Sequence, residues 1–335
     1  MGNHGVSCGF AFVSSLNGLI QLRMMSADQM RSLAGLDNLS TGRLLGAFVV
    51  GVFIALLLYF GAGEVLSHPA PRAIGAPPPD FPAQTVRLSG PSMGTVVGWF
   101  SPGQPGQGAV LLFHGVRADR TQMLARARFL HRSGYATLLI DLPAHGESAG
   151  SRITFGGREA EGVTASLAFV RRELPGERVA VIGVSLGAAS TVLAHFAQPP
   201  DAVILESMYP TIEEALKNRL TMRLGPMGAL FAPALLWQLP LRTGVKVQDL
   251  HPIRSLPHLG APVFIASGAE DQQTPWAETQ RLFEAAKEPK EMWRVEGAGH
   301  VDLHAFSSEE YERRILNFLE KYVRREGPLP KSKHG

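Results

Sequence analysis

The stretch RVAVIGVSLGAASTVLAHFA, residues 178–197, decides the fold. It opens with an apolar run typical of a buried strand and continues, after GVSLG, as an Ala-rich run typical of a helix. A serine within G-x-S-x-G on a sharp strand-to-helix turn is presented at the top of a sheet, and the glycines leave room for the crowded backbone. The stretch therefore predicts that Ser185 is a nucleophile. The alternative is a small residue buried where a helix meets a sheet.

The same pentapeptide pattern also occurs around Ser92 and Ser148. Ser92 stands beside Pro91 between two short apolar runs, and Ser148 is followed by the irregular stretch SRITFGG. Because neither serine joins a strand directly to a helix, we interpret both as parts of surface turns.

Apolar runs and amphipathic stretches alternate on both sides of this segment. The runs expected to be strands are 84–88, 95–100, 109–113, 136–141, 178–184, 202–205, 262–267 and 292–295. The stretches expected to be helices are 120–132, 157–174, 186–196, 275–286 and 308–324. Alternation of this kind predicts an α/β fold, a mostly parallel, doubly wound sheet with helices on both faces. The first two strands precede any helix, so we expect them to be antiparallel.

A nucleophilic serine needs a base that titrates near neutral pH, and histidine fits that need. On this topology the partners follow the serine in the order acid, then histidine. Asp271 and His300 each lie in a loop just after a predicted strand, where an open parallel sheet places its ligand crevice. We therefore predict a Ser185–Asp271–His300 triad. Glu206 and Glu270 remain alternative acids.

An anionic tetrahedral intermediate needs backbone N–H donors aimed at its oxygen. The residue after the nucleophile, Leu186, is expected to supply one, and Val116, in VLLFHGV, the other. We expect His114 to orient this loop. Asp141 and His145, in IDLPAHGES, are interpreted as bracing the loop around the site.

Taken together, the motifs HGV, DLPAHGES, GVSLG, LES, GAEDQQTP and GAGH resemble the α/β-hydrolase superfamily, in its α/β-hydrolase-domain-containing (ABHD-type) branch. The resemblance covers residues 109–324 and implies the α/β-hydrolase fold, the triad named above, and a carboxylesterase- or lipase-like serine hydrolase of esters or thioesters. It implies no metal and no organic cofactor. The chain departs from many relatives at Val116, where they carry a polar residue or glycine. A resemblance to acylaminoacyl peptidases is weaker, because no β-propeller precedes the body.

Residues 44–63 are twenty uncharged, mostly apolar residues, long enough to cross a bilayer as one helix. Arg31 and Arg43 precede this span and Arg72 follows it, which favours a cytoplasmic N terminus and an extracytoplasmic catalytic domain. Cleavage as a signal sequence after Ala62 or Ala70, giving a secreted enzyme, is the alternative.

The chain divides by composition into five parts. They are an N-terminal leader (1–43), a transmembrane helix or signal anchor (44–63), a Pro-rich linker (64–83), a hydrolase domain (84–327) and a C-terminal tail (328–335). The linker carries six prolines in residues 67–83 and is expected to be an extended, semi-rigid spacer.

Within the domain, residues 209–245 are rich in Leu and Met and poor in charge, which predicts a small helical cap. Such a lining suits an apolar acyl group, so we expect a small-molecule apolar ester as substrate. The alternative is helices that merely pack on the body. Two other functions stay open: a membrane-tethered serine peptidase and a non-catalytic binding protein of the same fold.

Composition excludes several other classes. Hydrophobic residues make up 45% of the chain, which argues against disorder. Lys+Arg 32 against Asp+Glu 29 gives a net charge of +3, with no basic stripe for nucleic acid. Cys8 is the single cysteine, so neither an intramolecular disulfide nor a cysteine zinc cluster is expected. The sequence predicts no particular oligomeric state.

Overall fold

The computed structural model describes residues 41–90 and 94–324. The predicted leader up to residue 40, Ser92 and the C-terminal tail lie outside the described residues. The chain divides into two units, residues 1–59 and 60–335. Helix α3 (Thr41–Ser67) contains the predicted span and is long and apolar enough to cross a membrane.

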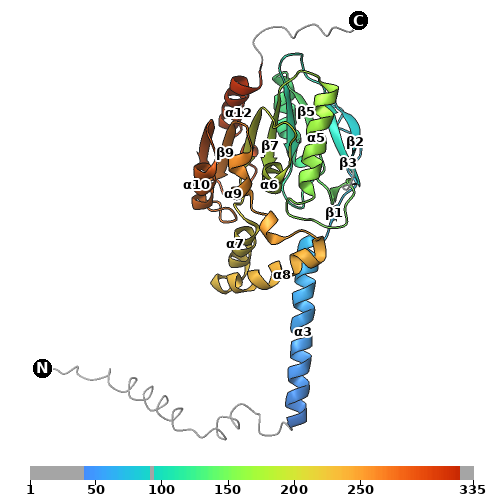
Figure 1. The fold of residues 1–335 in the computed structure, drawn as a ribbon, viewed down its shortest axis with the longest axis vertical. Coiled ribbons are helices and arrows are strands. Elements are labelled where there is room, and N and C mark those ends of the chain that lie inside the picture. The colour runs from blue at the N-terminus through green and yellow to red at the C-terminus, as the bar shows by residue number, and fades with distance from the viewer. Residues whose placement is uncertain (1–40, 91–93, 325–335) are drawn as a thin grey trace, which may run out of the picture. The chain divides into compact units, whose positions relative to one another are not determined.

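The second unit is built on an eight-stranded sheet. Its strands are β2 (Gln84–Gly90), β3 (Gly94–Ser101), β4 (Ala109–Phe113), β5 (Ala136–Ile140), β7 (Val179–Val184), β8 (Ala202–Glu206), β9 (Val263–Gly268) and β10 (Lys290–Val295). Their order is β10-β9-β8-β7-β4-β5-β3-β2 (Figure 1). β2 and β3 pair antiparallel, as do β3 and β5, and the other neighbours are parallel. The predicted mostly parallel sheet with an antiparallel entry is confirmed.

Helices cover both faces of this sheet. The covering helices are α4 (Leu124–Arg132), α5 (Glu159–Glu173), α6 (Leu186–Leu193), α10 (Trp276–Ala285) and α12 (Ser308–Tyr322). Alternate residues of one strand face opposite sides, so Leu111 packs in the core cluster of α5, α6 and α10, whereas Leu112 packs in that of α4 and α12. Short helical turns complete the body: η1 (Arg120–Met123), η3 (Val247–Asp249), α9 (Pro252–Ser255), η4 (Leu256–His258) and α11 (Leu303–Phe306).

The helix after Ser185 is shorter than predicted. We expected it over 186–196, but α6 ends at Leu193 and the backbone of Ala194 is extended. The N–H of Ala194 reaches back only three residues, to the carbonyl of Thr191 at 3.3 Å, a bond that tightens and closes the last turn.

Between β8 and β9 the chain forms the predicted helical cap. It consists of α7 (Ile212–Leu224), η2 (Pro226–Phe231) and α8 (Ala232–Thr243). Thr211 begins α7 by accepting the N–H of Glu214 on its hydroxyl, and Gly225, with φ of 70°, ends it.

The Pro-rich segment before the sheet makes specific contacts with the body. The two-residue strand β1 (Ala70–Pro71) pairs in parallel with β6 (His145–Gly146). The side chain of Phe81 is buried, and the Ser101 hydroxyl donates to the carbonyl of Pro82 at 2.7 Å. The segment that we expected to act as a spacer is thus held against the body by backbone and side-chain bonds.

Candidate active site

Ser185 sits on the strained turn that the pentapeptide predicts. Its φ of 50° and ψ of −105° lie outside the regions that a non-glycine residue prefers. A Cβ on Gly183 would lie 2.6 Å from a backbone nitrogen of α6, and one on Gly187 would collide with the carbonyl of Phe113. The N–H of Ser185 donates to the carbonyl of Glu206 at 2.8 Å, which ties the turn to β8. Packing on both sides therefore holds the serine in its strained conformation.

The hydroxyl of Ser185 is available for chemistry. The residue is only 3% exposed, and its Oγ has no hydrogen-bond partner in the described part of the chain. No described hydrogen bond therefore holds this hydroxyl away from a substrate.

Asp271 and His300 meet as the sequence predicts. The Nδ1–H of His300 donates to Oδ2 of Asp271 at 2.7 Å, which leaves Nε2 of the ring with its lone pair. Asp271 also accepts the N–H of Gln273 at 2.8 Å and the hydroxyl of Thr274 at 2.7 Å. Burial would raise the pKa of Asp271, but the hydrogen bonds from His300 and Thr274 outweigh it and lower that pKa. Asp271 is therefore ionised and fixes the tautomer of the imidazole.

The three predicted triad residues lie along one edge of the sheet. Ser185 follows β7, Asp271 follows β9 and His300 follows β10, and these strands are parallel with β8 between β7 and β9. Their carboxyl ends share this edge, where open α/β sheets bind ligands. Among the described hydrogen bonds, none joins Ser185 to His300.

Glu206, the alternative acid, has a different partner. Its carboxylate accepts Nη2 of Arg126 at 2.7 Å and the hydroxyl of Tyr311, and both charged side chains are 1% exposed. Arg126 also donates to Asp302 at 2.9 Å. The structure thus assigns Glu206 to a buried ion pair. No local pattern predicts this cluster, because Arg126 and Tyr311 lie 80 and 105 residues from Glu206 along the chain.

Two backbone N–H groups lie free beside the serine, at Val116 and Leu186. Both residues line one pocket with Ser185, and a Cβ built on Gly115 would lie 3.8 Å from that of Ser185. No described hydrogen bond uses the N–H of either residue. The loop that carries Val116 is held in place, because the N–H of Gly115 donates to the side-chain oxygen of Gln122 at 2.7 Å.

The ring of His114 orients this loop. Its Nδ1 donates to the carbonyl of Gly115 at 2.7 Å, and its Nε2 accepts the N–H of Leu142 at 2.9 Å. Burial, and then the neighbouring His145, lower the pKa of His114 to about 3, so it stays neutral. Asp141 braces the adjacent turn by accepting the N–H groups of Arg120 and Glu147, each at 2.8 Å.

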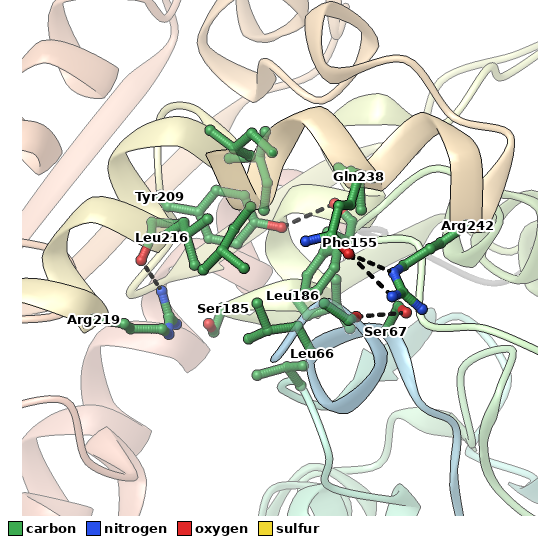
Figure 2. Close-up of a pocket in the computed structure, with 17 residues that line it drawn as sticks. Leu66, Ser67, Phe155, Ser185, Leu186, Tyr209, Leu216, Arg219, Gln238 and Arg242 are labelled. Carbon is green, nitrogen blue, oxygen red and sulfur yellow. Dashed lines mark hydrogen bonds between the residues drawn. The ribbon is translucent and has the colours of Figure 1, made fainter. Parts of the chain in front are cut away.

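A pocket that is partly open to solvent lies over Ser185. Its walls are mostly apolar and come from the cap, the body and the last residues of α3 (Figure 2). The apolar side chains include Leu66, Ile212, Leu216, Leu235, Leu236 and Leu239. Sequence reasoning missed two parts of this lining. Leu66 and Ser67 had been assigned to the linker, and Arg219 was not singled out.

The described residues contain no group of three or more His, Cys, Asp or Glu side chains placed to hold a metal ion. Two further histidines pair with carboxylates outside the predicted triad. Nε2 of His251 pairs with Glu213 at 2.8 Å, and that of His304 pairs with Glu312 at 3.0 Å.

Comparison with known proteins agrees with this geometry. The model of the alpha/beta hydrolase family matches residues 109–314. The chain belongs to the alpha/beta hydrolase family. Among curated relatives of this hydrolase, the uncharacterized protein Rv2307c of Mycobacterium tuberculosis is 30% identical over 255 residues, which cover 73% of this chain and 80% of the relative.

Solved structures of similar fold include esterases. The esterase Pf2001 of Pyrococcus furiosus superposes with a TM-score of 0.62 at 22% identity and covers 77% of this hydrolase and 98% of its own chain. The acylaminoacyl peptidase of Pyrococcus horikoshii superposes with a TM-score of 0.55 at 15% identity, covering 74% of this hydrolase and 42% of its own chain. At these identities the likeness shows the fold alone.

Proposed function

We propose that the protein is a serine esterase that cleaves carboxylic esters or thioesters through an acyl-enzyme, with Ser185 as nucleophile, His300 as base and Asp271 as the acid that orients it. The observation that carries the proposal is the hydrogen-bonded Asp271–His300 pair at the sheet edge that also presents the strained Ser185. The esterases among the solved structures of this fold support ester hydrolysis.

Each residue has a defined task in this mechanism. The Oγ of Ser185 attacks the ester carbonyl carbon while Nε2 of His300 takes its proton. The free N–H groups of Val116 and Leu186 stabilise the oxyanion of the tetrahedral intermediate. The imidazolium of His300, held by Asp271, then protonates the leaving alcohol, and a water repeats the sequence to release the acid. No described hydrogen bond joins Ser185 to His300, and in this proposal that bond forms when the substrate binds.

The substrate that fits best carries an apolar acyl group. The pocket beside Ser185 is lined by leucines of α7 and α8, which would desolvate a hydrocarbon chain. Several large apolar side chains on the outer face of the cap are exposed, among them Phe231, Trp237 and Leu241. An exposed apolar face on the cap suits a substrate that is drawn from a lipid surface.

We also propose that α3 is retained as a single-pass membrane anchor, with its N terminus in the cytoplasm and the catalytic unit outside. The last turn of α3 belongs to the catalytic unit. Glu64 forms ion pairs with Arg152 and, at 2.6 Å, with Arg242, and Leu66 lines the pocket. Cleavage after Ala62 would retain both residues, but cleavage after Ala70 would remove them from the enzyme.

A substrate panel tests the proposed function. Purified full-length protein in detergent should hydrolyse p-nitrophenyl esters, with kcat/KM rising from acetate to octanoate as the chain fills the pocket. Acyl-peptide p-nitroanilides should react far more slowly. A preference for the anilides would support the peptidase instead, and hydrolysis of neither class would favour a non-catalytic binding protein.

A further inference from the structure

One cation in the pocket has no anionic partner among the residues that the structure describes. Arg219, on α7, lines the same pocket as Ser185 and is partly buried. Its one described hydrogen bond runs from Nη1 to the carbonyl of Ala215 in its own helix, at 2.9 Å. Within the described residues, no carboxylate lies within ion-pair distance of Arg219, and burial lowers the pKa of its guanidinium. The other N–H donors of this lining residue have no hydrogen-bond partner among the described residues.

The second arginine of the pocket shows the contrast. Arg242, on α8, donates to Glu64 at 2.6 Å, to the carbonyl of Phe60 at 2.6 Å and to Gln238. In Figure 2 the labelled Ser185 lies between the two arginines, with Leu186 and Phe155 on the Arg242 side. Arg242 thus holds the end of α3. No described hydrogen bond or ion pair joins Arg219 to another side chain.

Two acidic groups act electrostatically on Arg219 without forming an ion pair with it. Asp271 accepts hydrogen bonds from His300 and Thr274, and Oε1 of Glu278 accepts from Asn218 at 2.7 Å, whereas Oε2 of Glu278 has no partner among the described residues. A guanidinium in an apolar pocket is costly unless it is paired, so this one is suited to a partner that arrives with the ligand.

We propose that Arg219 binds an oxyanion, a phosphate or carboxylate, carried on the alcohol part of an acyl ester. The inference rests on the proposed esterase function and specifies its substrate class. The planar guanidinium presents paired N–H donors that match the two oxygens of such a group. An ester whose chain lies along Leu235, Leu236 and Leu239 and whose anion meets Arg219 would place its carbonyl at Ser185.

Two pairs of matched esters test the proposal. One substrate is 4-octanoyloxy-3-nitrobenzoate, whose leaving group carries a carboxylate, and its neutral counterpart is the corresponding methyl ester. Monooleoylglycerol and its phosphate form a second pair, which distinguishes a phosphate from a carboxylate as the group recognised. The readout is the ratio of kcat/KM for the anionic ester to that for the neutral one. A charge-assisted pair predicts a ratio of about 10 to 100 in at least one pair, expressed mainly in KM.

Variants test whether Arg219 causes the preference for the anionic ester. Arg219→Gln should bring the ratio close to unity, and Arg219→Lys should keep part of it. The matched control is Arg223→Gln, which removes an equal charge from the exposed side of the same helix and should leave the ratio unchanged. Labelling of Ser185 by a fluorophosphonate verifies that each variant has a folded site.

Two results would overturn the proposal while leaving the esterase function intact. The first is wild-type enzyme with no preference for either anionic ester. The second is an Arg219→Gln or Arg219→Lys variant that loses activity on anionic and neutral esters equally. Either variant would then assign a structural role to Arg219. Absence of hydrolysis and of Ser185 labelling in the wild type would instead refute the proposed function, and the inference with it.

Discussion

Replacing Glu206 by Gln distinguishes a buried ion pair from a catalytic acid. The carboxylate of Glu206 accepts Nη2 of Arg126 at 2.7 Å and the hydroxyl of Tyr311, with both charged side chains 1% exposed. Gln keeps the size of the side chain but removes its charge, so the Arg126 guanidinium loses one of its two carboxylate partners. The other, Asp302 at 2.9 Å, remains.

The size of the effect follows from this arrangement. Breaking a buried ion pair by removing one partner costs about 3–5 kcal/mol. Because Asp302 still compensates Arg126, we expect the lower end, about 3 kcal/mol. For a domain of this size that loss corresponds to a fall in Tm of about 6–12 °C.

The assay measures stability and turnover on the same variants. Glu206→Gln should lower the Tm as stated, yet hydrolyse p-nitrophenyl octanoate almost normally well below that Tm, per molecule labelled at Ser185. Asp271→Asn should do the reverse, with kcat falling about 10⁴-fold and little change in Tm. A Glu206→Gln variant that stays stable but loses turnover would refute the reasoning and make Glu206 the acid.

Three further predictions concern His114, the pocket wall and the cap. His114 has a pKa of about 3 when folded and about 6.5 when unfolded, so its contribution to stability is complete above pH ~6.5 and is lost as pH falls toward ~3. Denaturant titrations measure the free energy of unfolding at each pH. Between pH ~7 and ~5 this free energy should therefore fall by about 2 kcal/mol less in His114→Gln than in wild type. Leu66→Trp should shift the preferred p-nitrophenyl ester toward shorter chains, and an unchanged chain-length profile would remove Leu66 from the acyl pocket. Phe231→Asp, on the exposed face of the cap, should slow hydrolysis of esters presented in vesicles but not of soluble ones, whereas equal slowing of both would argue against contact of the cap with lipid.

Much of the fold could be predicted because its signals are local. The strand 109–113 appears with the expected bounds, since a run of apolar residues between glycines and polar turns has little choice when both faces of the sheet are buried. The turn at Ser185 was equally predictable, because the glycines around it are required by contacts within a few residues and with the neighbouring β4. The contact of Asp271 with His300 followed from the placement of each after a strand.

What the sequence did not reveal depends on contacts between distant segments. Arg126 and Glu206 are 80 residues apart, and no pattern along the sequence pairs them. Leu66 belongs to the stretch that the sequence assigns to the linker, and only the folded chain shows it at the pocket over Ser185. Arg219 is one of several charged residues on α7, and no pattern along the sequence shows which of them lines the pocket.

The most direct test of the central claim is covalent labelling of the intact protein with a fluorophosphonate, followed by peptide mapping. The account predicts one adduct, on the peptide that contains Ser185, and none in Ser185→Ala. It further predicts that His300→Ala labels much more slowly while keeping the wild-type Tm. Labelling that persists in Ser185→Ala, or a folded wild-type protein that takes up no label at all, would contradict it.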